Sequence, residues 1–510
     1  MEMKLAPWPA IFIPFLLFVI LFRRHRHCRY NLPPGPKPWP IIGNLNLIGP
    51  IPHHSLHQLS QKYGPIVHLK LGLKDFIVVS SADAAKAFLK THGNTFSSRP
   101  KNNAGKYTGY NYSDLLWGPY GPHWRQARKI CFSQLLSQKS IESSEYIRKE
   151  EMKNMLHELF ISSDKPVLLR DYLYALNLNI ISRMVLGKKY VKKDQSGFMF
   201  SWEEFRDLVD EFFLVNTIAN IGDLIPWLDF LDLQGYTKRM KDFNAKFDRF
   251  LEHVLNEHEE RRKGAENYVA TDMVDMLLQL AEDRTLEVKL QRHSVKALTQ
   301  DLIVAAVDTS GVIVEWGMSE LLKNPEIIRK ATEELDRVIG RDRWVEEKDI
   351  TKLPYIEAIA KESMRLHPAA AVLPPTTSAV DGDSKVLGYD IPGGAQVIVN
   401  VWAIGRDPTI WENPYEFNPE RFIGKDIDVI GHHFELLPFG AGRRICPGYV
   451  LGLKVVQVSL ANLVHGFSWS LPGHMKKEDL NMEEVPRLTN VRKQPLEAVI
   501  KPRLSSHLYL

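Results

Sequence analysis

The most constraining feature of this sequence is a glycine-rich loop around one cysteine, Phe439-Gly440-Ala441-Gly442-Arg443-Arg444-Ile445-Cys446-Pro447-Gly448. Glycines at this density allow tight turns beside a flat cofactor and leave backbone N–H groups free to approach a sulfur atom. A cysteine in such a loop can bind a metal as a thiolate, because the metal keeps the sulfur deprotonated. Arg444 offers a forked donor for a carboxylate. A buried structural cysteine beside an exposed turn is the alternative, but the complete spacing F-x-x-G-x-R-x-C-x-G favours a ligand.

The rest of the chain has the composition of a large globular protein. Hydrophobic residues make up 44% of the 510 positions and charged residues 25%, which is too apolar for a disordered chain. Three cysteines, Cys28, Cys131 and Cys446, are too few for a disulfide scaffold of this size and fit a reducing compartment. After residue 40 we find no second linker, low-complexity tract or repeat of fixed period, so we expect one domain over residues 41–510.

The N-terminal segment has the pattern of a membrane anchor. An uncharged stretch of 18 residues, Leu5 to Phe22, is followed at once by the basic cluster Arg23, Arg24, Arg26 and Arg29. Such a stretch can span a bilayer as a helix, and basic residues on this side place the body in the cytosol. A cleaved signal peptide has the reverse order. Residues 1–30 are therefore predicted to be a single-pass anchor, with a shallow irregular anchor or a buried core helix as the alternatives.

A proline-rich segment follows the anchor. Leu32 to Pro38 contains four prolines, which exclude a helix and stiffen the chain. We interpret residues 31–40 as a hinge that holds the body at a set distance from the membrane.

Hydrophobic periodicity predicts a mainly α fold with a small β-sheet region. The apolar residues have helical spacing over 142–160, 202–213, 236–262, 272–281, 295–323 and 325–339. Strand-like runs are short and cover 66–71, 76–79 and 396–401, the last after the turn Pro392-Gly393-Gly394.

At the cysteine loop the sequence resembles the cytochrome P450 family, and the resemblance covers essentially the whole chain. It is most similar to plant microsomal enzymes that act on specialised metabolites. The resemblance implies the P450 fold and a haem b cofactor, whose iron Cys446 would bind as the axial thiolate. Phe439 would cover the proximal face of the haem, and Arg444 would reach a haem propionate.

Two further constellations match the same family. Glu362 and Arg365 lie three residues apart on one helical face, and Arg421 follows in Pro419-Glu420-Arg421-Phe422. An isolated E-x-x-R pair is a common surface feature; the resemblance implies a structural Glu-Arg-Arg network behind the haem. Trp124 and Arg128 place two donors four residues apart on a helix. They would bind propionates by resemblance; the alternative is a tryptophan packed inward with a solvated arginine.

Asp308 and Thr309 are the candidate catalytic residues. They lie in a long apolar helix that ends at Asn324-Pro325. A threonine there commonly bonds back to the preceding turn. By resemblance this helix crosses the distal face of the haem, where cleavage of the O–O bond needs protons in a dry pocket. Thr309 would be the hydroxyl on the oxygen side, and Asp308 would support the proton relay.

Three departures from the family pattern fall near the predicted pocket. Ala306 stands where the family usually has glycine, and no Lys, Arg or His occurs between Pro368 and Lys385. Pro486 and Arg487 stand where related enzymes tend to have an apolar residue and glycine. These changes leave oxidative cyclisation, coupling or rearrangement as an alternative to ordinary hydroxylation.

The resemblance also outlines a substrate pocket whose wall segments are mostly apolar, which implies a lipophilic substrate. An inward Arg487 would indicate a carboxylate or phenolate on the substrate; the alternatives are a solvated loop residue or a propionate partner. The candidate pocket residues are Phe212, Phe213, Ala305, Ala306, Leu373, Thr376, Arg487 and Leu488.

Together these features predict a membrane-anchored haem-thiolate monooxygenase that oxidises a lipophilic plant specialised metabolite, such as a terpenoid or phenylpropanoid, and the resemblance implies the endoplasmic reticulum membrane. No G-x-G-x-x-G motif opens a helix, so electrons would come from a separate partner, which by resemblance is NADPH-cytochrome P450 reductase. The expected partners are this reductase, O2, the substrate and membrane lipid. The body after residue 30 has no net charge, so no nucleic-acid partner is expected. A non-oxygenating isomerase or dehydratase and a non-catalytic scaffold are the alternatives.

Overall fold

Helices form most of the regular structure in the computed structural model, which describes residues 30–189, 200–263, 268–379 and 382–510. The predicted anchor over residues 1–30 lies outside the described residues except for Tyr30. The helices are α2 (Pro52–Tyr63), α3 (Ala82–Lys86), α4 (Asn103–Tyr107), α5 (Pro122–Ile130), α6 (Gln138–Ser143), α7 (Glu145–Ile161), α8 (Leu169–Leu186), α9 (Trp202–Thr217), α10 (Ile221–Leu224), α11 (Tyr236–Lys263), α12 (Met273–Glu282), α13 (Arg292–Lys323), α14 (Pro325–Val338), α15 (Pro354–Leu366), α16 (Val401–Ile404) and α17 (Tyr449–Gly466).

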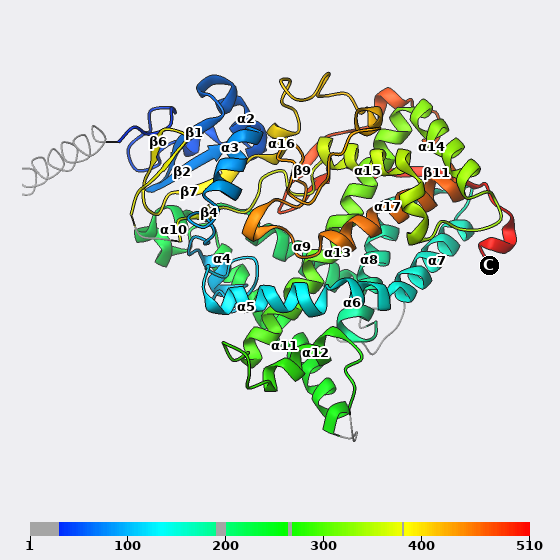
Figure 1. The fold of residues 1–510 in the computed structure, drawn as a ribbon, viewed down its shortest axis with the longest axis horizontal. Helices are drawn as coiled ribbons and strands as arrows, with labels where there is room; N and C mark the ends of the chain where they lie inside the picture. The colour runs from blue at the N-terminus through cyan, green and yellow to red at the C-terminus, as the bar shows by residue number, and fades with distance from the viewer. Residues whose placement is uncertain (1–29, 190–199, 264–267, 380–381) are drawn as a thin grey trace, which may run out of the picture.

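The strands are short and form small, separate sheets. The largest sheet has the order β1-β2-β7-β4, in which β2 and β7 are parallel and the other pairs are antiparallel. It lies at one end of the molecule beside α2, α3 and α16 (Figure 1). The strands are β1 (Ile66–Leu71), β2 (Lys74–Val79), β3 (Pro166–Leu168), β4 (Thr376–Thr377), β5 (Ser384–Val386), β6 (Tyr389–Ile391), β7 (Gln396–Val399), β8 (Phe467–Ser470), β9 (Glu484–Pro486), β10 (Asn490–Arg492) and β11 (Glu497–Pro502).

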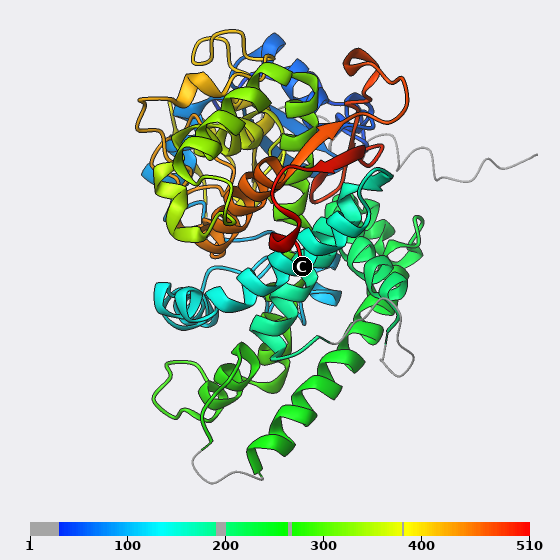
Figure 2. The ribbon, with the colours of Figure 1, turned by 90° about the vertical axis from the view of Figure 1, so that its right-hand side faces the viewer.

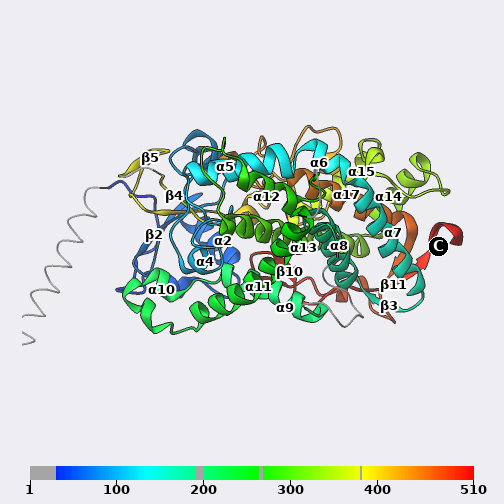
Figure 3. The same cartoon turned by 90° about the horizontal axis from the view of Figure 1, so that it is seen from below.

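Helix α13 is the centre of the helical part. It contacts α8, α11, α12, α15 and α17, and Figures 1 and 3 show it beside α8. Figure 2 shows the long green helix α11 extending away from the orange and red C-terminal segments. A helix that is apolar on all sides is expected to be buried. Among the described residues α13 is the one helix long and apolar enough to cross a membrane, and 78% of its most apolar window is buried in the protein.

Local sequence signals explain where several helices begin. Proline is the first residue of α2, α5, α14 and α15, where its fixed φ suits the first turn and its missing N–H costs no hydrogen bond. Ser201 and Glu204 form a capping box at α9. The strand expected over 396–401 was two residues too long, because the side chain of Asn400 accepts a hydrogen bond from the N–H of Ala403 and caps α16.

The proline-rich segment is extended and hydrogen-bonded to the body. The backbone N–H of Asn31 donates to the side chain of Asp390 in β6, and the carbonyl of Pro34 accepts from the N–H of His68 in β1. A Cβ on Gly35 would lie 2.0 Å from the carbonyl oxygen of His68. The segment therefore lies directly against the sheet.

Candidate active site

The cysteine loop contains a 3-10 turn, Gly442–Arg444, and ends at Gly448 directly before α17. Gly440 and Gly442 have φ angles of 69° and 68°, which favour glycine. A Cβ on Gly442 would lie 2.1 Å from the backbone oxygen of Leu89, so no other residue fits without moving the backbone. The N–H of Cys446 donates to the carbonyl of Phe439 at 2.9 Å, which closes the loop and presents the sulfur from a fixed backbone.

Burial raises the pKa of the Cys446 thiol, and the backbone N–H of Gly448 and the charge of Arg128 offset only part of that rise. Arg128 also donates to the carbonyl of Ile445 at 2.5 Å, so the same guanidinium holds the loop and opposes the effect of burial on the thiol. The deprotonation of this thiol would come from a bound metal cation.

Helix α13 faces this loop with the face that carries the candidate catalytic residues. Most of α13 is buried, but one stretch in its middle is not. There Ala305 is exposed, and Asp308 and Thr309 are half-buried. A Cβ on Gly452 of α17 would lie 3.5 Å from the ring of Phe439 and 3.7 Å from Oγ of Ser310, the residue after Thr309. The loop, α17 and this turn of α13 therefore meet at one place.

The side chains of Asp308 and Thr309 have different partners. Oγ1 of Thr309 donates back to the carbonyl of Ala305 at 2.9 Å. Oδ2 of Asp308 accepts from Oγ1 of Thr489 at 2.7 Å. Desolvation raises the pKa of Asp308, and the hydrogen bond from Thr489 opposes that rise. A carboxyl with a raised pKa can hold a proton at pH values where an exposed aspartate is ionised.

Thr489 is not among the candidate site residues, because a threonine in a short hairpin carries no distinctive sequence signal. The turn between β9 and β10 carries it to α13, 181 positions away in the chain.

A cluster of guanidinium groups lies beside the loop. Arg444 stacks over the indole of Trp124 at 3.9 Å and donates to the carbonyls of Ser97, Leu115 and Gly118. The indole N–H of Trp124 donates to the carbonyl of Leu115 at 3.1 Å. The structure thus brings Trp124, Arg128 and Arg444 together.

Arg99 is a further member of this cluster, and it is not among the candidate site residues identified from the sequence. It is 8% exposed, and its Nη1 donates to the carbonyls of Pro374 and Pro375, inside the segment that lacks a basic residue. An isolated arginine after two serines has no local signal; only the fold shows its neighbours.

The cluster holds more positive than negative charge. Desolvation and the charges of Arg99 and Arg128 lower the pKa of Arg444 to about 8. Asp114 lies near Arg444 and Arg99, and desolvation raises its pKa to about 7. Among the described residues the three guanidiniums donate to backbone carbonyls and form no ion pair with a carboxylate. Haem b carries two propionates, so this donor set fits the cofactor in charge and in chemistry.

Glu362, Arg365 and Arg421 form a buried network behind this region. Both oxygens of Glu362 accept from Arg365, at 2.7 and 2.8 Å, and Oε1 also accepts from Arg421 at 3.0 Å. The side chains of Glu362 and Arg365 are fully buried, and that of Arg421 is 7% exposed. Arg365 further donates to the carbonyls of Gly405, Pro414 and Glu416, which ties α15 to the chain before the cysteine loop.

The candidate pocket residues lie in several environments. Phe212 and Phe213 are each 3% exposed, and Phe212 packs against Phe243 of α11. Thr376 is buried in β4. Leu373 lies beside the cysteine loop, because a Cβ on Gly440 would be 3.6 Å from it.

At the hairpin tip, Arg487 forms an ion pair with Asp210 of α9 at 2.8 Å. Its guanidinium is therefore already paired within the protein. The neighbouring Leu488 is half-buried and packs against the main core.

Comparisons with known proteins identify the family of the chain. The sequence model described as Cytochrome P450 matches residues 33–496. The chain is 44% identical to a dimethylnonatriene synthase of Zea mays over 100% of this chain and 98% of the relative. It is 41% identical to a flavonoid 3'-monooxygenase of Petunia hybrida over 100% and 99%. A zebrafish cytochrome P450 structure with abiraterone has a TM-score of 0.73 at 25% identity, covering 89% of this chain and 100% of that one. The chain is a member of the cytochrome P450 family, a haem-thiolate monooxygenase with haem b as its cofactor.

Proposed function

We propose that this enzyme is anchored in the endoplasmic reticulum membrane and oxidises an uncharged terpenoid of plant specialised metabolism. Residues 1–30 would be the anchor, 31–40 the hinge and 41–510 the cytosolic catalytic domain. NADPH-cytochrome P450 reductase would deliver electrons from NADPH. The observation that carries the proposal is the meeting of the Cys446 loop, the Asp308–Thr309 turn and the arginine cluster at one site.

The substrate class rests on two observations. The ion pair between Arg487 and Asp210 uses the one basic side chain among the candidate pocket residues, which disfavours an anionic substrate. Two relatives with 44% and 45% identity are named as synthases of dimethylnonatriene and trimethyltridecatetraene, which are methyl-branched polyenes. Relatives with 41% identity are named for flavonoid oxidation. A branched, acyclic terpenoid therefore fits better than a flavonoid.

The names of the two polyene synthases also favour a second candidate reaction. Compared with the glycine that is usual at this position, Ala306 adds one methyl group to the helix face beside Asp308. The residue is half-buried there. An oxidative reaction other than hydroxylation is therefore the alternative outcome at the same site.

Each residue of the site would have a distinct part in the reaction. Cys446 would hold the iron, and Arg99, Arg128, Arg444 and Trp124 would hold the propionates, with Arg99 in place of the basic residue missing after Pro368.

When bound, the haem supplies the activation of O2. Thr309 would hold a proton at its Oγ1 next to the oxygen, and Asp308 would pass a proton towards it. The apolar helix face would exclude water.

Turnover of defined substrates tests the proposal. Membranes containing the enzyme and the reductase are incubated with acyclic terpenoid alcohols or with flavonoids, with and without NADPH. We expect NADPH-dependent products and a substrate-induced spin shift with the terpenoids. Conversion of flavonoids alone would contradict the substrate class, and turnover without NADPH would favour an isomerase or dehydratase. Complete haem loading with no spin shift by any compound would favour a scaffold.

Replacing Thr309 with alanine is expected to lower the product formed per NADPH by about tenfold or more, with unchanged haem content. The variant removes the hydroxyl beside the oxygen site but keeps the helix. Thr299→Ala is the matched control, since Thr299 makes the same back-bond on the same helix, to Val295 at 2.8 Å, but is fully buried. If both variants form the same amount of product per NADPH, Thr309 has no part in the proton relay.

Replacing Thr489 with valine is expected to shift the inflection of the pH–rate profile that belongs to Asp308 to higher pH. The hydrogen bond from Thr489 lowers the pKa of Asp308, so its loss lets desolvation raise that pKa further. Thr489→Ser keeps the donor and should restore the profile. A profile that is identical in all three proteins would exclude Thr489 as a positioning residue.

A further inference from the structure

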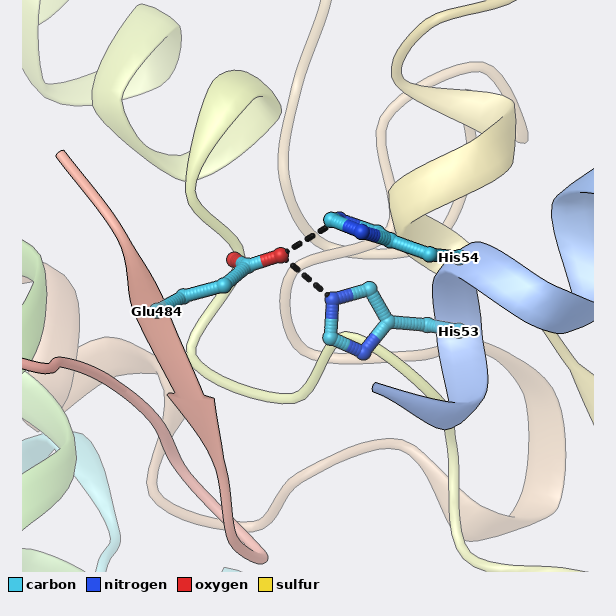
Figure 4. Close-up of side chains that lie close together, drawn as sticks. All are labelled: His53, His54 and Glu484. Carbon is cyan, nitrogen blue, oxygen red and sulfur yellow. Dashed lines mark hydrogen bonds and ion pairs between the residues drawn. The ribbon is translucent and has the colours of Figure 1, made fainter. Parts of the chain in front are cut away.

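Two histidines and one glutamate converge between α2 and the β9–β10 hairpin (Figure 4). Nε2 of His53 lies 2.7 Å from Oε1 of Glu484, and Nε2 of His54 lies 2.6 Å from the same oxygen. The histidines are in the first turn of α2 and Glu484 begins β9. Residues 431 positions apart in the chain thus meet at one carboxylate.

The neighbouring residues fix all three side chains. His53 is 2% exposed, and its backbone carbonyl accepts a hydrogen bond from Asn400. The ring centroids of His53 and His54 lie 5.6 and 4.5 Å from the ring centroid of Trp402. Asn490 donates to the second oxygen of Glu484. The group is therefore preorganised, which lowers the cost of binding an ion.

The three side chains do not satisfy one another completely. His53 makes a hydrogen bond to Oε1 of Glu484. Nε2 of His54 is close to the same oxygen, but it is buried and lacks hydrogen-bond geometry. A bound cation would satisfy both imidazole nitrogens and the carboxylate at once, because each offers one lone pair and all three atoms lie within 4.8 Å of one another.

We propose that His53, His54 and Glu484 bind one divalent zinc-type ion, separate from the haem. Two imidazoles and one carboxylate, with a fourth position open to water, are a common donor set for zinc. The side chain of His54 is 39% exposed, so the group lies close to the protein surface although Nε2 itself is buried. Ligand atoms around tetrahedral zinc lie about 3.3 Å apart. On binding the ion, the carboxylate of Glu484 therefore has to move away from the two imidazole nitrogens by roughly half an ångström.

The donor atoms of the group select against calcium and magnesium. Glu484 is the one carboxylate in the group, and hard cations require several oxygen ligands. A site with two imidazole nitrogens and one carboxylate oxygen fits a borderline-soft ion such as Zn²⁺. The guanidinium of Arg406, which stacks on Trp402 at 3.9 Å, disfavours any cation and does not distinguish zinc from calcium or magnesium.

The ion would couple the outer side of the protein to the active site. It would join α2 to β9, and the turn of the same hairpin carries Thr489, which donates to Asp308. Opening of the hairpin breaks that contact, so a metal clamp at Glu484 would hold the positioning of Asp308. This consequence rests on the proposed function, but the binding of the ion does not.

Zinc binding to the full-length, haem-loaded protein without a histidine tag tests the site. Equilibrium dialysis against Zn²⁺ with elemental analysis should give one zinc per haem more in the wild type than in His54→Ala or Glu484→Gln. His57→Ala is the matched control, because His57 lies on the same helix against Trp402 but outside the group. Hydrogen exchange of residues 484–492 should slow on adding zinc in the wild type and the control alone.

Equal zinc contents in the wild type, His54→Ala and Glu484→Gln would overturn the site. Unchanged hairpin exchange on zinc binding would overturn the clamp. The carbon monoxide spectrum identifies folded protein in each sample, and the partly exposed His54 gives a variant that tests the site even where Glu484→Gln does not fold. These measurements use no substrate, so their result is independent of the proposed reaction.

Discussion

Cys446→Ala is expected to abolish the red-shifted Soret band of the reduced carbon monoxide complex and all NADPH-dependent turnover. The sulfur comes from a loop that Gly440 and Gly442 fold tightly, and Gly448 and Arg128 offset part of the burial that raises the pKa of the thiol. Alanine removes the ligand but keeps the backbone, so any haem that remains must bind without thiolate. The measurement is the difference spectrum of membranes normalised to protein by immunoblot.

Cys131 provides the matched control for this experiment. It is the other free cysteine in the described part of the chain and is fully buried. Its thiol is desolvated, which raises its pKa to about 12, so it is a neutral core residue. Cys131→Ala should keep the red-shifted band with some loss of stability. A normal band in Cys446→Ala, or its loss in Cys131→Ala alone, would contradict the assignment of the ligand.

The helices of this fold could be predicted closely from the sequence. The helix expected over 236–262 is α11 (Tyr236–Lys263), and that over 295–323 lies within α13 (Arg292–Lys323). Long apolar periodicities and N-terminal prolines are local signals that tertiary contacts do not override. The short strand before α16 was less predictable, because the capping by Asn400 competes with an extended run of β-branched residues.

Only part of the site is visible in the sequence. The local motif around Cys446 indicates a ligand, whereas the E-x-x-R spacing points to Glu362 and Arg365 only together with the family resemblance. The contacts of Arg99 with Pro374 and of Thr489 with Asp308 span 275 and 181 positions. Such pairs have no common sequence signal, since each side chain alone is ordinary. The fold alone reveals the charge excess around Arg444.

Glu362→Ala is expected to have the largest effect on stability. The change leaves the guanidiniums of Arg365 and Arg421 without their carboxylate, and removal of one partner from a buried ion pair costs about 3–5 kcal/mol. That loss is a large part of the stability of a typical domain. Arg365 also holds the carbonyls of Gly405 and Pro414, so the segment before the haem loop should loosen as well.

Expression yield and thermal inactivation of the carbon monoxide band measure this effect. We expect almost no correctly folded, haem-loaded Glu362→Ala protein and a strongly lowered inactivation temperature for any that forms. Glu357→Ala on the same helix is the control, because Glu357 pairs with Lys361 at 2.8 Å and is 41% exposed, and an exposed pair of this kind contributes about 0.5 kcal/mol or less. Comparable losses in the two variants would show that the helix as a whole, rather than the buried charge, sets the stability. A stable Glu362→Ala enzyme would mean that the carbonyl contacts of Arg365 and Arg421 are sufficient without the carboxylate.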